Sequence, residues 1–289
     1  MLSEKNNKRH KSSFAIMHVA MAVLILASCN NDENKIEDNV NEPVLPAPQN
    51  LTYTVIKAYP HDTAAFTQGL EWHGGTLLES TGLYGKSMLR QLDLTNGKSS
   101  KQIKNDKEIF AEGITVLRDT VYQLSWENHL VFLYDAKSLK LLGTKNWSYQ
   151  GWGITNNGNT LIISDGSDKL YFVEPNTMQV KNILSIKDHM GPVNNLNELE
   201  MIEGYLYANR WQYDYILKID PNNGNVLATI DFTDFLRKNT QSDLSYLSQN
   251  NSTAQINGAV LNGIAYNADK KTIFITGKLW PEIFEIKLQ

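Results

Sequence analysis

The sequence has almost no cysteine, little net charge and no clustered histidine. Its 289 residues include one cysteine, Cys29, so no disulfide can form within a single chain and the fold must rely on its core. The 27 basic and 31 acidic residues leave a net charge of −4, too small to indicate a nucleic-acid partner. The six histidines lack the paired spacing of metal ligands. We therefore expect no metal, no cofactor and no nucleic acid.

Long hydrophobic runs are also missing, except near the N-terminus. A basic start from Lys5 to Lys11 precedes an apolar run over residues 14–27, which is too short for a comfortable membrane span and indicates a signal peptide over residues 1–28. The run ends in Leu-Ala-Ser-Cys29, which resembles the bacterial lipobox. We expect Cys29 to be lipidated, rather than to serve as a buried thiol or a nucleophile, and the chain to be anchored to the cell envelope. Asn30 after the cysteine favours the outer membrane.

Residues 29–50 have the composition of a tether. They are rich in Asn, Asp, Glu and Pro and carry too few large apolar side chains to bury a core of their own. Prolines at 43, 46 and 48 would keep the end of this segment extended. Strand-like sequence begins at Leu51, so we expect the folded domain to span residues 51–289.

One pattern repeats through this domain. A short step marked by Gly or Glu recurs at Gly69, Gly113, Gly153, Glu198 and Gly263, at intervals of 44, 40, 45 and 65 residues. All but the last interval match the length of a propeller blade. Each marker is followed by a turn, a second apolar strand and a third strand, with Asn-Gly, Pro-Asn or Asp-Ala turns after the first four third strands. The sequence thus predicts an all-β fold, a five-bladed β-propeller.

The two ends of the repeat need separate explanations. The last blade stops at its third strand, and the strand Leu51–Tyr59 has no blade of its own, so we expect it to close the ring as the missing fourth strand. The long fourth interval contains residues 232–254, whose apolar spacing indicates a helical insertion. No repeat of exposed apolar residues suggests an oligomer, and we expect a monomer.

Polar and aromatic residues accompany the markers. The first strand of each blade lines a propeller's channel, so these side chains are expected to converge at one mouth. Buried-strand positions that are polar in several blades have little packing justification unless they meet a ligand. The set comprises Phe66, Gln68, Phe110, Glu112, Trp152, Asn197 and Glu198, with Trp126, Trp211 and Lys278 from the ends of second strands. The simpler alternatives are an aromatic plug and a structural Glu112–Lys278 ion pair.

From Leu51 to the C-terminus the chain resembles the plant and bacterial glutaminyl cyclotransferases. The motifs that carry the resemblance are Tyr59–Leu70, Leu78–Gly85, Phe110–Thr115, Gln123–Trp126, Gly151–Gly153, Ser164–Ser167, Asn197–Glu200 and Leu261–Ile264. Two positions depart from the family pattern. Gln150 stands where relatives often have an acid, and Arg210 stands where a small or apolar residue is commoner.

The resemblance implies an enzyme that converts an N-terminal glutamine of peptides or proteins to pyroglutamate and releases ammonia. It implies Glu112 as catalytic acid, which we expect to act as a proton shuttle. Lys278 and Asn197 are expected to stabilise the developing oxyanion. It also implies substrate-binding roles for Phe66, Gln68, Phe110, Trp126, Trp152 and Trp211.

Two other classes of protein remain open from the residues alone. A metal-dependent lactonase propeller would use Glu112, Asn197 and Glu198 as ligands. A non-enzymatic propeller displayed on the cell surface would bind a peptide or glycan without reaction.

Overall fold

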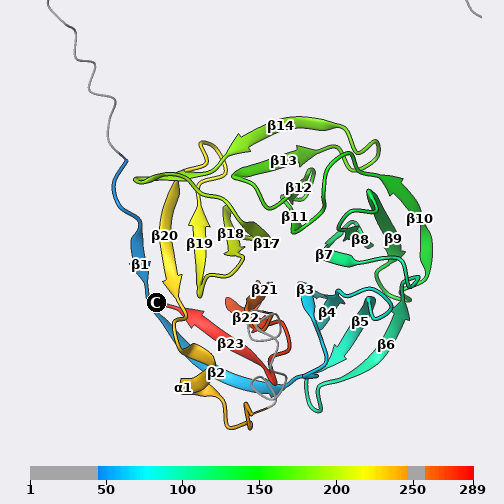
Figure 1. The fold of residues 1–289 in the computed structure, drawn as a ribbon, viewed down its shortest axis with the longest axis horizontal. Helices are drawn as coiled ribbons and strands as arrows, with labels where there is room; N and C mark the ends of the chain where they lie inside the picture. Colours follow the sequence, from blue (N-terminus) through cyan, green and yellow to red (C-terminus); the bar gives the residue numbers. More distant parts are fainter. Residues whose placement is uncertain (1–44, 246–257) are drawn as a thin grey trace, which may run out of the picture. The chain divides into compact units, whose positions relative to one another are not determined.

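The computed structural model describes residues 45–245 and 258–289, where five mainly antiparallel sheets surround a common centre (Figure 1). The expected signal peptide, Cys29 and most of the tether lie outside the described residues, as do residues 246–257. The predicted five-bladed β-propeller is confirmed. In the described part of the chain, no helix is long and apolar enough to cross a membrane.

The blades follow one another along the chain, each with its first strand at the centre. Blade 1 contains β3 (Thr67–His73), β4 (Thr76–Thr81), β5 (Met88–Asp93) and β6 (Lys98–Lys104). Blade 2 contains β7 (Ala111–Leu117), β8 (Thr120–Ser125), β9 (Leu130–Asp135) and β10 (Leu141–Asn146). Blade 3 contains β11 (Ile154–Asn156), β12 (Leu161–Ser164), β13 (Lys169–Val173) and β14 (Val180–Ser185). Blade 4 contains β17 (Leu196–Ile202), β18 (Tyr205–Arg210), β19 (Tyr215–Ile219) and β20 (Val226–Asp231), and blade 5 contains β21 (Leu261–Asn267), β22 (Thr272–Gly277) and β23 (Glu282–Leu288).

The repeated glycines lie where the central strands approach most closely. A Cβ added at Gly69 would lie 2.8 Å from the Cα of Gly113, and one at Gly113 would lie 2.9 Å from the Cα of Gly153. Neither site has room for a side chain. In blade 4 the equivalent marker is Glu198, whose carboxylate accepts hydrogen bonds from the main-chain N–H groups of Leu70 (3.3 Å) and Ile264 (2.9 Å). The marker pattern therefore arises because the central strands leave no room for side chains at these positions.

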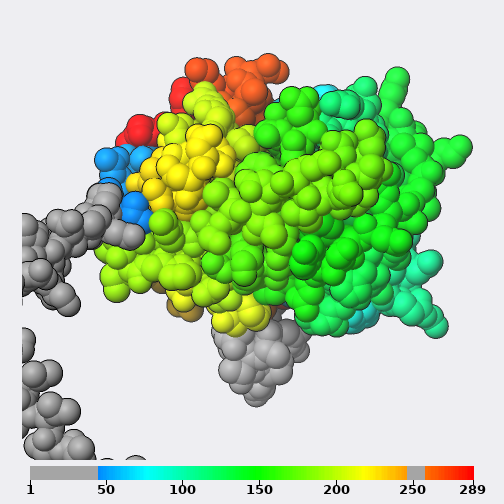
Figure 2. All heavy atoms as spheres, turned by 90° about the horizontal axis from the view of Figure 1, so that it is seen from above, coloured from blue at the N-terminus to red at the C-terminus, as the bar shows by residue number. Residues whose placement is uncertain are grey.

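Among the residues that the structure describes, five apolar clusters lie between neighbouring blades and hold the ring together. Examples are Leu78 with Val121 between blades 1 and 2, Leu199 with Ile162 between blades 3 and 4, and Ile264 with Ile216 between blades 5 and 4. Their strands read as apolar alternations because each blade buries one residue in two against the next blade. Figure 2 shows the ring from the side, with the chain of blades 3 and 4, coloured green to yellow, covering the near face.

The N-terminal strand closes the ring as expected. β2 (Tyr53–Pro60) pairs antiparallel with β23 and supplies the fourth strand of blade 5. The preceding strand β1 (Gln49–Leu51) pairs in parallel with β20 and becomes a fifth strand of blade 4. Residues 49 and 50, which we placed in the tether, are thus part of the sheet, because β20 offers them an unpaired edge.

The insertion after blade 4 is less helical than predicted. Within its described residues only α1 (Phe235–Asn239) is helical, and the remainder of 232–254 that can be assigned is irregular. Phe232 and Phe235 are both buried in the cluster between blades 4 and 5, where Phe232 stacks on Tyr53 at 4.7 Å between ring centroids. These two buried rings fix the start of the segment against the propeller, and α1 begins at the second of them. A short hairpin of β15 (Lys187–Asp188) and β16 (Gly191–Pro192) links blades 3 and 4.

Candidate active site

β-Bulges interrupt four of the central strands at positions that carry polar side chains. The pairing register shifts between Thr67 and Gly69 in β3, between Ala111 and Ile114 in β7, between Leu196 and Leu199 in β17, and between Leu261 and Ile264 in β21. A bulge leaves residues unpaired and changes the direction of their side chains. The polar residues within these four bulges are Gln68, Glu112, Asn197 with Glu198, and Asn262.

A single cavity of about 330 Å³ collects the side chains that the sequence singled out. It is lined by Phe66, Gln68, Phe110, Glu112, Trp126, Trp152, Asn197, Trp211 and Lys278. The starts of first strands and the ends of second strands supply these residues, and both lie at the same end of the blades. Glu198 does not line this cavity, because its carboxylate is held between the main chains of β3 and β21.

The Gln68 amide joins the two ionisable groups of the cavity. Lys278 Nζ donates to Gln68 Oε1 at 2.6 Å, and Gln68 Nε2 donates to Glu112 Oε1 at 3.0 Å. Lys278 and Glu112 are 3% and 5% exposed. Across the described residues no direct salt bridge joins them, so the ion pair that we considered as a structural alternative is replaced by a hydrogen-bonded relay.

Burial moves both ionisable groups toward their neutral forms. Loss of solvent raises the pKa of Glu112 well above its usual value near 4.5, and the positive charge of Lys278 opposes this only in part. Loss of solvent lowers the pKa of Lys278 to about 8, against the attraction of Glu112. A carboxyl group of raised pKa in a cavity is suited to exchanging protons near neutral pH.

Aromatic rings form the rest of the wall in two edge-to-face groups. Phe110 meets Phe66 at 6.2 Å and Trp126 at 5.7 Å between ring centroids, and Trp152 meets Trp211 at 5.7 Å. Two glycines of the family motifs provide the space. A Cβ on Gly82 would lie 2.5 Å from Phe110 Cε1, and one on Gly166 would lie 2.7 Å from the Trp152 ring.

Asn197 offers an amide to the cavity. It is 2% exposed, and its buried Oδ1 accepts no hydrogen bond from any residue that the structure describes. Its main-chain oxygen, in contrast, accepts from Ser164 Oγ at 2.7 Å. A buried amide oxygen without a partner is costly unless a ligand completes its hydrogen bonds.

Asn262 is a polar neighbour of the site that the sequence reasoning missed. Its Nδ2 donates to the Thr67 main-chain oxygen at 3.0 Å and lies 3.4 Å from Gln68 Oε1, so it holds the amide that bridges Lys278 and Glu112. The signal was present, because Asn262 has the same position in its marker as Asn197 has in the preceding one.

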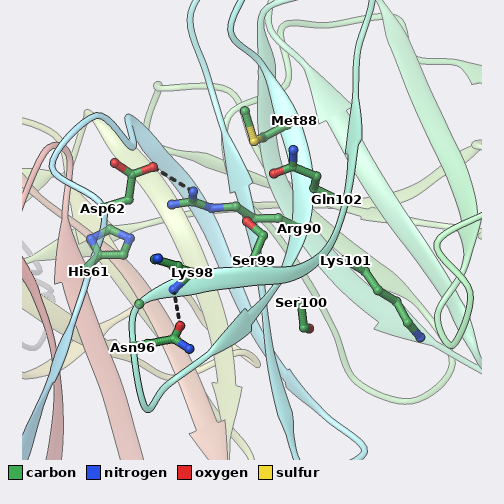
Figure 3. A pocket seen from close by; sticks show the side chains of 11 residues that line it. His61, Asp62, Met88, Arg90, Asn96, Lys98, Ser99, Ser100, Lys101 and Gln102 are labelled. Atoms are coloured by element: carbon green, nitrogen blue, oxygen red, sulfur yellow. Dashed lines mark hydrogen bonds and ion pairs between the residues drawn. The ribbon is translucent and has the colours of Figure 1, made fainter.

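A second polar cluster supports the segment that leads to Phe66 and Gln68. Glu79 accepts from Arg90 Nε at 2.6 Å and from Thr67 Oγ1 at 2.7 Å, and it lies 3.0 Å from His61 Nε2. Arg90 also donates to Asp62 Oδ2 at 2.9 Å (Figure 3). Of these residues, His61, Asp62 and Arg90 border an open hollow of about 590 Å³ whose lining shares no residue with the cavity of Glu112. His61 is buried in this cluster.

The donor set gives no indication of a metal centre. Within residues 45–245 and 258–289, no three His, Asp, Glu or Cys side chains are grouped as ligands. Among the ligands of the lactonase alternative, Glu198 uses both carboxylate oxygens to accept main-chain N–H groups, and Glu112 Oε1 accepts from Gln68 Nε2.

Known proteins resemble this chain in sequence and in fold. A glutaminyl-peptide cyclotransferase of Arabidopsis thaliana is 41% identical over 237 residues, which are 81% of this chain and 71% of the plant protein. The crystal structure of Myxococcus xanthus glutaminyl cyclase matches with a TM-score of 0.73 and 34% identity, over 84% of this chain and 98% of that one. Residues 20–288 match the family described as glutamine cyclotransferase. The chain therefore belongs to the glutamine cyclotransferase family.

Proposed function

We propose that this protein is a glutaminyl-peptide cyclotransferase that converts an N-terminal glutamine of peptides or proteins to pyroglutamate, with Glu112 as its proton shuttle. Membership of the family and the similarity to the Arabidopsis enzyme support the activity. The observation that supports the mechanism is a buried carboxyl group, Glu112, hydrogen-bonded beneath an aromatic wall.

The reaction is intramolecular, so the cavity acts first by shaping the substrate. The α-amine of the glutamine attacks its own side-chain amide carbon, a C–N bond forms, and the amide nitrogen leaves as ammonia. Holding the substrate in the reactive conformation supplies much of the rate. The aromatic wall packs on the aliphatic part of the glutamine and keeps water away from the amide carbon.

Glu112 moves the proton that the reaction must transfer. As a carboxylate it accepts a proton from the attacking amine, and as a carboxylic acid it returns that proton to the departing nitrogen. An α-amine has a pKa of about 7.7–8.0, so an ordinary glutamate is a poor match as a base. The raised pKa of Glu112, caused by burial, brings the two groups closer.

Lys278 and Asn197 face the charge that develops on the amide oxygen. The tetrahedral intermediate carries a negative oxygen, which fixed N–H donors in a dry cavity stabilise strongly. Lys278 is 3% exposed, and Lys278 and Asn197 line the same cavity, where Nζ of Lys278 and Nδ2 of Asn197 are the donors offered to this oxygen. Gln68 keeps Lys278 and Glu112 apart and orients both groups.

The Glu112→Gln variant tests this mechanism. Release of ammonia from a Gln-initiated peptide is expected to fall by at least about 100-fold, the usual contribution of a general acid–base. Glu203→Gln is the matched control, because Glu203 is an exposed surface carboxylate. Undiminished turnover in a folded Glu112→Gln protein would remove Glu112 from the mechanism.

We also propose that the protein is exported and anchored by a lipid on Cys29, with the outer membrane as its location. The proposal rests on the apolar run before Cys29 and the polar segment after it. Metabolic labelling with a fatty acid is expected to mark the wild type and not Cys29→Ser. Equal labelling of both proteins would contradict the proposal.

A further inference from the structure

Three indole N–H groups point at a single residue beside the cavity, Gln150. Trp126 Nε1 and Trp152 Nε1 each donate to Gln150 Oε1 at 3.1 Å. Trp147 Nε1 donates to the main-chain oxygen of the same residue, also at 3.1 Å. Trp126 and Trp152 line the cavity, whereas Gln150 itself does not.

The orientation of the Gln150 amide is fixed from its other end. Gln150 Nε2 lies 3.4 Å from Glu127 Oε1, so the amide nitrogen faces this carboxylate and the amide oxygen faces the two indoles. The main chain around Gln150 is held as well, because Trp147 is 2% exposed in the cluster between blades 2 and 3. A side-chain acceptor held at both ends is suited to positioning its donors.

Gln150 also stands where the aromatic wall is divided. Phe66, Phe110 and Trp126 form one edge-to-face group, and Trp152 with Trp211 forms the other. Among the described residues no ring contact joins Trp126 to Trp152. The shared oxygen of Gln150 is the link between the two groups.

We propose that Gln150 is a positioning residue, which sets Trp126 and Trp152 at the separation that accepts the side chain of an N-terminal glutamine. Two hydrogen bonds to one acceptor fix the relative placement of the rings, which apolar packing alone leaves adjustable. Their loss widens or misaligns the slot and weakens substrate binding more than it slows the chemical step. This inference rests on the proposed function.

Gln150→Leu removes the acceptor and keeps a side chain of similar size. In ¹H–¹⁵N spectra of the free protein labelled at tryptophan, the indole signals of Trp126 and Trp152 are expected to shift and their protons to exchange faster. The signal of Trp147 is expected to stay, because its acceptor is main-chain oxygen. KM for a Gln-initiated peptide should rise about tenfold, as expected for two neutral hydrogen bonds of about 0.5–1.5 kcal/mol each. We expect kcat to change much less than KM, because Gln150 positions the rings and does not contact the reacting groups.

Gln150→Glu is the conservative rescue and Gln179→Leu the control. The carboxylate of Gln150→Glu keeps an acceptor for both indoles, so their signals and KM are expected to stay near wild type, within about threefold after the repulsion from Glu127. Gln179 is an exposed glutamine before β14, and its replacement should change neither readout. Gln150→Asn, whose amide is one methylene shorter, provides a second loss-of-contact variant if Gln150→Leu does not fold.

Unmoved Trp126 and Trp152 signals in Gln150→Leu would overturn the proposal. So would shifted signals with an unchanged KM, because the indoles would then be fixed without consequence for the substrate. A wild-type protein that forms no pyroglutamate would instead overturn the proposed function, and the indole signals of the free protein would still decide whether Gln150 positions the rings.

Discussion

Lys278 and Glu112 contact opposite ends of one side-chain amide, that of Gln68. The amide oxygen accepts a hydrogen bond from Lys278 Nζ at 2.6 Å, and the amide nitrogen donates to Glu112 Oε1 at 3.0 Å. Reversing the amide would place its NH₂ group against the Lys278 ammonium and its oxygen against the Glu112 carboxylate. Its orientation is therefore determined by both charges and by Asn262. The charge of each ionisable group thereby affects the pKa of the other without a direct hydrogen bond between them.

The charge of Lys278 should be visible in the pH dependence of Glu112. Lys278 lowers the raised pKa of Glu112, so removing this charge in Lys278→Met raises that pKa further. If carboxylate is the active form, the acidic limb of kcat/KM moves to higher pH in Lys278→Met. A loss of about 100-fold in kcat is also expected from the missing oxyanion contact. Measuring kcat/KM from pH 4 to 10 checks both, and an acidic limb that stays in place or moves to lower pH would contradict the coupling.

The space beside Gly82 should control substrate binding. In Gly82→Ala the new methyl group would lie 2.5 Å from Phe110 Cε1 and 3.0 Å from Gln68 Cγ, so the Phe110 ring must move. Overpacking of this kind costs about 1–3 kcal/mol, and we expect KM to rise by about tenfold. The melting temperature measures the loss of stability from overpacking, and steady-state kinetics measures the change in KM. An unchanged KM together with a lower melting temperature would show that Phe110 moves without affecting the substrate.

The cluster around Glu79 should make the protein sensitive to acid. Burial alone would raise the pKa of Glu79, but the charges of His61 and Arg90 and the hydrogen bonds from His61 and Thr67 outweigh it and lower the pKa to about 2. A carboxylate with a lowered pKa stabilises the fold above its unfolded value near 4.5, and this is lost as pH falls from 4.5 toward 2, about 3 kcal/mol in all.

Glu79→Gln tests that contribution. The variant should lose about 3–5 kcal/mol at pH 7, because Arg90 keeps only Asp62 as a charged partner, and lose less at pH 3. Urea unfolding at the two pH values gives the comparison. An equal loss at both would mean that the ionisation of Glu79 adds nothing to stability.

Another carboxylate should act in the opposite direction. Burial raises the pKa of Glu200 well above its usual value, and the charge of Glu71 raises it further. Its stabilisation is present below the unfolded pKa and is lost as pH rises through the folded pKa, so its ionisation costs stability in alkali. Glu200→Gln removes this cost and keeps an oxygen for the Tyr266 N–H at 2.8 Å.

We expect Glu200→Gln to be more stable than wild type at pH 8, by roughly the 0.5–2 kcal/mol of a typical stabilising substitution, and no more stable at pH 4. Thermal unfolding at the two pH values is the measurement. Lower stability at pH 8 would show that the ionised Glu200 is favourable.

The features predicted from the sequence are those that repeat. Gly69, Gly113 and Gly153 recur because no side chain fits where the central strands meet, and β2 was found because blade 5 lacked a strand. The nine cavity residues followed from their positions beside these markers or at the ends of second strands, and from the family resemblance. Contacts that occur once could not be predicted in this way. Examples are the hydrogen bond of Asn262 to Gln68 and the hydrogen bonds of two indoles to Gln150. These contacts depend on how separate blades face each other, and a local sequence pattern does not predict them.

The pairing of β2 with β23 sets an order on the assembly of the cavity. Thr52 and Gln289, joined by a hydrogen bond, are 237 positions apart. During synthesis β2 emerges long before its partner, and Lys278 emerges just before β23. Because the cost of closing a loop grows with its length, this contact is among the last that the entropy of the chain allows. A nascent chain that has emerged only as far as blade 4 therefore lacks Lys278, the ammonium group of the cavity. Such a chain should be inactive until blade 5 is complete.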